Sequence, residues 1–500
     1  MHMKKIAILT AVALGSLLVF SSCDLDIDPD TSIKGDDAYT FEYVEGERAG
    51  VYSGLKSITS GAYLYDADYQ SDLFNETAMS GNRGGFFHRW NLYPNDQDVT
   101  GIWSGYYSMI DRINYTIRAI DVVSDKDDVT ENLAQLALYR AEMCLLRAYT
   151  VHQLVLRFCE DYDPASASQQ PGVPYPTEFN PDAKLPRETL VDTYRKINED
   201  IKSAETLLRN IQGEADNIYL SGDAVTAFKA QVALQMHDYT NASAYASSLY
   251  AKYPLAQSQT DLERMWREDS SSETIFQPEV VPASLGSVGS MYDYYSGTWS
   301  SAVSAFNCAP GYVLENWVKE LYEAGDRRVG VYLANSRVFY NDKTFNGFLM
   351  TKFLGNKMFQ TDKKIYVYKN MPKVFRIADM YLIDAEAKYR SEGDALTPLN
   401  ALRESRGLSA LESATVTGDD LFTEIKNERV RETLGEGQRL TDLKRWNEGI
   451  SRDYQTSLQN VLRGYIYNIP AGTYMFVWPI PQLEMSNNPN IGTQNPGYLQ

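Results

Sequence analysis

The chain has 500 residues, of which 44% are hydrophobic, and its formal net charge is −19 at pH 7. This length allows about two to four domains or one large body built from repeats, and the hydrophobic share is ample for a core. A surface this acidic repels nucleic acids and anionic polymers, so we expect no nucleic-acid partner, whereas neutral or cationic ligands stay open.

The N-terminus has the pattern of an export signal. A Lys-Lys pair precedes an apolar run over residues 6–20, which is too short for a membrane-spanning helix. Residues 20–23 read FSSC, which resembles a bacterial lipobox with Phe in place of the usual Leu. We therefore expect residues 1–22 to be a lipoprotein signal peptide and Cys23 to be acylated, because several acyl chains make a stable membrane anchor.

The segment after Cys23 is acidic, with Asp at alternate positions from 24 to 30. This spacing is similar to the start of a calcium-binding loop, but Pro29 occupies the place of the turn glycine and Gly35 that of the bidentate glutamate. We interpret residues 23–38 as a lipidated acidic tether, and we expect no metal and no cofactor.

Two regions, about 39–100 and 258–373, are rich in Gly, Ser, Asn and aromatic residues and show weak periodicity. We expect them to form one loop-rich lobe with short β elements, such as residues 365–368. Long irregular segments in an exported domain are usually packed or functional loops.

Helical patterns fill the intervening regions. Residues 131–158 repeat small and apolar side chains at alternating intervals of four and three. Residues 224–236 and 242–250 read as a helical hairpin, and so do 376–390 and 399–406. The hairpins have the size and layout of tetratricopeptide repeats without the full consensus, so an ordinary helical bundle stays open as an alternative.

Two C-terminal stretches are unusual. Residues 428–446 carry dense charges, many of them three or four residues apart, where opposite charges meet on one helix face. Gly435 and Gly437 divide this stretch into two predicted helices, the second starting near Gln438. By itself the pattern is equally typical of a solvated charged helix. Residues 476–498 read FVWPIPQLEMSNNPNIGTQNPGY.

Together, these two stretches resemble the C-terminal signature of the SusD/RagB family, and residues 141–158 resemble the first helix of that family. The matching motifs are EGQR at 436–439, DL at 442–443, RW at 445–446, PIP at 479–481, NPN at 488–490 and QNPGY at 494–498. The resemblance implies a mainly α fold, with tetratricopeptide-like helical repeats packed against an irregular loop-rich lobe with short β elements.

The resemblance also implies an organisation and a role. We expect a single body over residues 39–500, with a helical-repeat scaffold at about 101–255 and 374–450 and the signature at 419–500. The family consists of surface lipoproteins of the outer membrane that bind nutrients rather than cleave them. The implied partners are a glycan and a SusC-like TonB-dependent transporter, with the lipid anchor holding the protein on the cell exterior.

Catalytic motifs are missing from the sequence, and we predict no catalytic residue. The four histidines lie far apart in the chain, and there is no HExxH, CxxC or Walker sequence. Sequence alone leaves open a pair of carboxylates that would make a glycoside hydrolase. A peptide-capturing, RagB-like member is the stronger alternative to glycan binding.

Two aromatic loops are the candidate binding site: residues 82–95, NRGGFFHRWNLYPN, and residues 291–306, MYDYYSGTWSSAVSAF. Aromatic rings cover the apolar faces of sugars, and Arg, Asn and Asp bond their hydroxyl groups. Starch-binding family members carry ligand residues where the first loop lies. The predicted glycan-binding residues are Arg83, Phe86, Phe87, Trp90, Tyr93, Asn95, Tyr292, Tyr294, Tyr295 and Trp299. The competing interpretation is that these rings belong to the core; Asp66, Asp68 and Asp72 could join the rim or cap turns.

Overall fold

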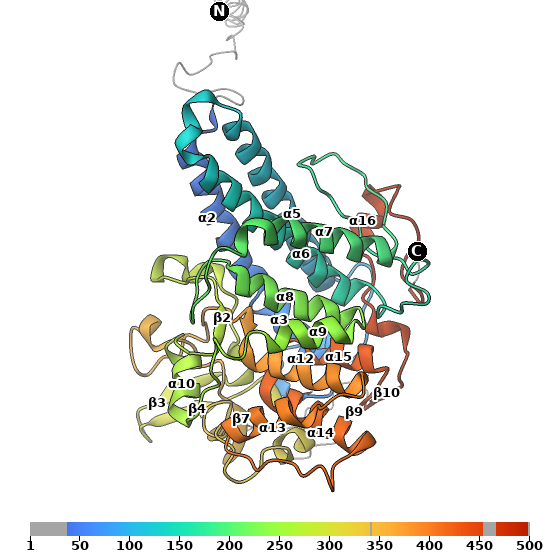
Figure 1. The fold of residues 1–500 in the computed structure, drawn as a ribbon. Coiled ribbons are helices and arrows are strands. Elements are labelled where there is room, and N and C mark those ends of the chain that lie inside the picture. Colours follow the sequence, from blue (N-terminus) through green and yellow to red (C-terminus); the bar gives the residue numbers. More distant parts are fainter. Residues whose placement is uncertain (1–37, 341–342, 454–466, 499–500) are drawn as a thin grey trace, which may run out of the picture.

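The computed structural model describes residues 38–340, 343–453 and 467–498 (Figure 1). The predicted signal peptide, Cys23 and all but the last residue of the predicted tether lie outside the described residues. Helices dominate, and the strands form one four-stranded and three two-stranded sheets within the described ranges. The predicted mainly α fold with short β elements is confirmed. Of the helices described, none is both long enough and apolar enough to span a membrane.

The upper part of the scaffold is a layer of long helices. α5 (Gln97–Ser124), α6 (Leu133–Phe158) and α7 (Leu190–Leu208) pack in sequence order, and α2 (Phe41–Ile58) lies against α5 (Figure 1). The helix predicted over residues 131–158 is confirmed as α6. Its small residues Ala141, Cys144 and Ala148 are buried, which lets the neighbouring helices approach closely.

The sequence analysis missed α2 and the shorter α3 (Ala62–Gln70), which lie in a region predicted to be irregular. Glycines lower the helix propensity of α2. A Cβ atom at Gly50 would meet the Arg112 guanidinium, and one at Gly54 would lie 2.9 Å from the Met109 sulfur. The same glycines that weaken the local signal therefore allow α2 to pack against α5.

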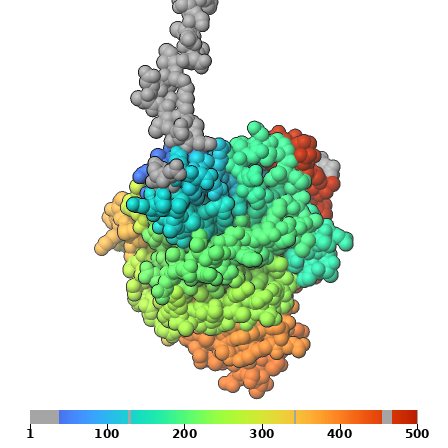
Figure 2. All heavy atoms as spheres, turned by 45° about the horizontal axis from the view of Figure 1, so that its top comes forward, coloured from blue at the N-terminus to red at the C-terminus, as the bar shows by residue number. Residues whose placement is uncertain are grey.

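The predicted helical hairpins form the lower part of the scaffold. They are α8 (Gly222–Gln235) with α9 (Tyr239–Ser247), and α12 (Ile377–Arg390) with α13 (Leu396–Ser405). α9 packs against α12, where the Tyr250 and Tyr381 rings stack with centroids 3.8 Å apart. The two hairpins, distant in sequence, thus form one continuous stack. Figure 2 shows its outer face, green across the middle and orange at the bottom.

The second lobe is irregular, with short strands. β1 (Phe74–Glu76) pairs with β5 (Tyr312–Leu314), β2 (Thr274–Phe276) with β8 (Phe375–Arg376), and β9 (Ile450–Ser451) with β10 (Asn468–Ile469), all antiparallel. The larger sheet has the order β3 (Gly297–Ser300), β4 (Ala305–Cys308), β6 (Leu333–Tyr340), β7 (Lys343–Met350). In it β4 and β6 are parallel, with Cys308 opposite Val338, and β6 and β7 form a hairpin. The remaining short helices are α4 (Gly85–His88), α10 (Gln259–Arg267), α11 (Asn316–Glu320) and α16 (Gln482–Asn487).

The strand predicted over residues 365–368 is wrong: this stretch is irregular. Tyr368 has a φ of +55°, which a strand does not accommodate. Its hydroxyl group accepts a hydrogen bond from the backbone N–H of Gly297, 2.8 Å away. Tertiary contacts therefore determine the conformation here, although aromatic and β-branched residues favour a strand locally.

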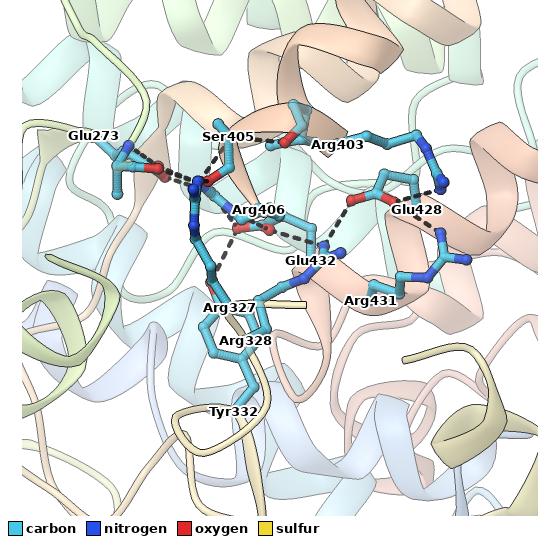
Figure 3. Close-up of polar contacts among 12 residues, drawn as sticks. Glu273, Arg327, Arg328, Tyr332, Arg403, Ser405, Arg406, Glu428, Arg431 and Glu432 are labelled. Atoms are coloured by element: carbon cyan, nitrogen blue, oxygen red, sulfur yellow. Dashed lines mark hydrogen bonds and ion pairs between the residues drawn. The ribbon is translucent and has the colours of Figure 1, made fainter. Parts of the chain in front are cut away.

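The charged C-terminal signature folds into α14 (Gly418–Thr433) and α15 (Arg439–Trp446), as predicted. Its charges are buried rather than solvated. Glu432 accepts hydrogen bonds from Arg376, Arg406 and Tyr332 and pairs with Arg328, with distances of 2.9 to 3.3 Å (Figure 3). Burial acts to raise the pKa of the Glu432 carboxyl, but the surrounding guanidinium groups hold it well below its ordinary value. This network joins the irregular lobe to the scaffold.

Candidate functional site

The two aromatic loops lie side by side. The Arg83 guanidinium forms a bidentate ion pair with the Asp293 carboxylate, with Arg83 Nε 2.9 Å from Oδ2. The Tyr312 hydroxyl group donates to the backbone oxygen of Arg83 at 2.6 Å, and its ring stacks on Tyr69 with centroids 3.5 Å apart. Residues from β5 and α3 thus hold the two loops together from beneath.

The first loop has a fixed conformation. Asn82 and Gly84 have φ values of +68° and +63°, so the chain turns sharply before α4. Arg89 then donates to the Glu76 carboxylate, with Nη1 3.0 Å from Oε2, and to the Asn82 side chain. These bonds set the direction of Phe86, whose ring is 40% exposed and lies 5.6 Å from the Arg89 guanidinium carbon. These contacts hold the loop in one conformation.

Six of the ten predicted ligand residues are accessible. Phe86, Tyr93 and Tyr292 are 40 to 52% exposed, and the Arg83 side chain is 55% exposed. Asn95 is also exposed, and Trp299 in β3 is partly exposed. A contact between these six residues and a ligand stays a prediction.

The prediction is corrected for the other four, which are buried: Phe87, Trp90, Tyr294 and Tyr295. Phe87 packs against Trp478, with ring centroids 4.8 Å apart, and Trp90 packs against Phe476 at 4.7 Å. Tyr294 and Tyr295 pack in the same way beneath the second loop. In the first loop Phe86 is exposed and the adjacent Phe87 is buried, and in the second loop Tyr292 is exposed while Tyr294 and Tyr295 are buried. One group of rings therefore faces solvent while the other supports it.

The sequence analysis did not predict that the rings of the second loop pack against Tyr366 and Tyr368, which lie about 60 positions further along the chain. From the Arg83–Asp293 pair, rings follow one another in edge or stacked contact, with centroid separations of 4.3 to 6.1 Å. We call this series the aromatic ribbon; its members are Tyr292, Tyr368, Tyr366, Phe306 and Trp299. The density of aromatic residues near position 366 was a usable signal, but it was interpreted only as a strand.

Tyr65 of α3 was also missed. It is partly buried and stacks on Tyr69 with centroids 5.0 Å apart, and its pKa is raised by burial and by nearby carboxylates including Asp66 and Asp293. A neutral phenol beside the Arg83–Asp293 pair can both donate and accept a hydrogen bond. Together, the rings and the ion pair can bind a polar molecule with flat apolar faces without covalent chemistry.

Comparison with known proteins identifies the family. A model described as "SusD family" matches residues 292–498, and one described as "Starch-binding associating with outer membrane" matches residues 29–234. The chain is a member of the SusD family. The first aromatic loop lies in one matched segment and the second in the other, so the site is assembled from both parts of the SusD-like chain.

One relative matches nearly the whole chain and another matches part of it. "SusD-like protein P38" of Formosa agariphila is 24% identical over 98% of both chains. "Starch-binding protein SusD" of Bacteroides thetaiotaomicron is 29% identical over 39% of this chain and 35% of its own length. A solved SusD superfamily protein from Bacteroides thetaiotaomicron has 23% identity and a TM-score of 0.76, covering 91% of this chain and 100% of the other. The last comparison shows the shared fold.

In this SusD-family chain the three aspartates considered for the rim lie in the interior. Asp72 forms a bidentate pair with Arg439 of the signature, both distances being 2.8 Å. Asp68 accepts from the Gly437 N–H at 3.0 Å, and burial raises its pKa to about 8. Asp66 is buried as well. Asp68 and Asp72 therefore fasten α3 and the residues that follow it to the signature, at Gly437 and at Arg439 of α15.

Proposed function

We propose that this protein captures an oligosaccharide or polysaccharide at the cell surface and delivers it to a SusC-like TonB-dependent transporter. Acylated Cys23 would hold it on the outer face of the outer membrane. The observation that carries the proposal is a set of exposed side chains, Phe86, Tyr292 and Arg83, which we call the shelf; buried Asp293 holds Arg83 in place. From Tyr292 the aromatic ribbon continues through the buried Tyr368 to rings that are partly exposed. Starch binding by a curated relative and starch binding with outer-membrane association in a matching family description support it.

Energetics favour a weak site that works through tethering. Each ring that a sugar covers contributes about 1.5–3 kcal/mol at most, before the cost of ordering the ligand. Two or three rings with a few hydrogen bonds therefore give low affinity for a single sugar segment. A polymer held beside a transporter stays available nonetheless, because tethering raises its effective concentration.

The test is a glycan-panel binding experiment with protein purified without residues 1–23. Wild type should retard in gels that contain the cognate polysaccharide and should bind its oligosaccharides in calorimetry. Tyr292→Ala combined with Trp299→Ala should weaken binding, while Tyr219→Ala, at an exposed ring of the scaffold, serves as the matched control. Equal binding by the double variant and wild type would refute the site.

Peptide capture is the second candidate. Strand β7 is at the end of its sheet, and an extended peptide could add to such a strand through main-chain hydrogen bonds. Binding of unstructured peptides without any glycan binding would favour this alternative.

Release of reducing sugar from a bound polymer would instead indicate a hydrolase, whereas we expect binding without cleavage.

A further inference from the structure

A cavity of about 150 Å³ lies where the helical scaffold meets the irregular lobe, behind the shelf. Helices α6, α8 and α12 line one side, and residues 288–291 and 370–374 line the other. Tyr368 connects the cavity to the shelf, because it lines the cavity and its ring contacts Tyr292.

The cavity wall contains buried polar atoms without partners. His152, Arg157, Trp266 and Asn370 are each at most 7% exposed. Among the described residues, nothing hydrogen-bonds to either ring nitrogen of His152, to Arg157 Nε, to Trp266 Nε1 or to Asn370 Oδ1. Buried polar atoms are nearly always satisfied in native proteins, so this set of donors and acceptors calls for a polar occupant.

The charges of the wall cancel. The lining cations are Arg157, Lys373 and Arg429, and the lining anions are Asp379, Glu436 and Asp442. Arg429 Nε lies 2.6 Å from the Asp442 carboxylate and its Nη1 lies 3.3 Å from Asp379. Burial and the nearby Arg157 charge lower the pKa of His152 to about 3, so its ring is neutral at pH 7. Each lining carboxylate is already paired with a cation, so a cationic molecule would find no free partner here. Arg157 forms no ion pair with the described residues and donates to Gln153 and to the backbone oxygen of Tyr63, so its free Nε can donate to a neutral hydroxyl group.

The remaining wall suits a sugar. Gln153, Gln231, Gln235 and Gln438 line it with carboxamides, and Leu64, Val288 and Phe353 line it with apolar side chains. A cavity of about 150 Å³ has room for several waters or for one compact polyhydroxylated molecule. We propose that this cavity is an internal subsite for one neutral monosaccharide unit. This inference rests on the proposed glycan-binding function and adds a second place where sugar is held.

The experiment uses protein labelled with ¹⁵N-histidine and the neutral monosaccharides glucose, galactose, mannose, xylose and fucose, with glucuronate as the charged comparator. A monosaccharide in the cavity should shift the His152 ring signals saturably, and His152→Phe identifies those signals. Asn370→Leu should weaken this binding at least tenfold. Gln235→Leu should weaken it severalfold and disturb the fold less than Asn370→Leu, because Gln235 is only partly buried while Asn370 donates to the backbone oxygen of Trp266.

The surface variant separates the two proposals. Tyr292→Ala should lose polysaccharide retardation and keep the His152 shift, because its ring lies outside the cavity. If no neutral monosaccharide shifts the His152 signals while the polysaccharide still binds, the subsite is refuted and the shelf stands. If the His152 signals shift and no glycan binds at the surface, the proposed capture function fails instead. A shift with glucuronate alone would overturn the assignment to a neutral sugar.

Discussion

The ion pairs of the shelf and of the C-terminal signature have the same chemistry in opposite surroundings. At the shelf, the Arg83 side chain is 55% exposed while it binds Asp293. In the signature network, the side chains of Arg328, Asp326, Glu428 and Glu432 are all fully buried. Only the arginine of the shelf pair is exposed, because the Asp293 side chain is 10% exposed. The Arg83 guanidinium can still contact a ligand from the solvent side, whereas no member of the signature network reaches solvent, and removing one leaves a charge in the interior. The surroundings of an ion pair, rather than its residue types, thus determine whether a ligand can reach it or whether it serves only to hold the fold together.

The largest effect should come from the buried network. Glu432→Gln removes the carboxylate shared by three guanidinium groups, and we expect the free energy of unfolding to fall by about 3–5 kcal/mol. Urea denaturation followed by circular dichroism measures the change. A loss below ~1 kcal/mol would show that the network adds little and would remove the contrast with the shelf.

At the shelf the expected effect is on binding instead of folding. Tyr292→Ala or Trp299→Ala should each weaken glycan binding by up to about 1.5–3 kcal/mol, roughly 10- to 150-fold, because each removes an apolar face. Calorimetry measures the binding, and the urea midpoint should stay close to wild type. A large fall in stability would mean that these rings belong to the core.

Burial of His152 in the cavity wall should make the free energy of unfolding depend on pH, with an effect of intermediate size. The pKa of His152 is lowered to about 3 in the folded state from an ordinary value of 6.5. Between these values the unfolded chain binds a proton that the folded chain does not, so this group makes stability fall as pH decreases from 6.5 toward 3. The limiting slope is about 1.4 kcal/mol per pH unit, and because the unfolded ring is only half protonated at pH 6.5, the loss of stability between pH 6.5 and 5.5 is about 1 kcal/mol. His152→Phe should remove that contribution in urea titrations at these two pH values. An unchanged slope in the variant would contradict this account.

The smallest effect is expected for an exposed pair of the lobe. Lys357 and Glu263 are about half exposed and lie 2.9 Å apart. Glu263→Gln should change the free energy of unfolding by less than ~1 kcal/mol, and added salt should shrink the difference further. A loss comparable to that of Glu432→Gln would show that exposure does not separate the two kinds of pair.

The scaffold helices and the two aromatic loops show which features a sequence can predict. Helix α6, the α8–α9 and α12–α13 hairpins and the break at Gly435 were predicted because short-range periodicity and glycines specify them. The aromatic loops were located by composition. Their internal division was not, since Phe86 and Phe87 are adjacent and of the same type yet differ completely in exposure.

The sequence by itself determined the helical hairpins, the family signature and the residue types available for binding, because these depend on neighbours within a few positions. Tertiary structure decided the rest. The Arg83–Asp293 pair spans 210 positions, and the Arg439–Asp72 pair spans 367. Which rings face solvent and which charges are buried depends on partners that only the folded chain brings together. A local sequence pattern contains no information about partners hundreds of positions away.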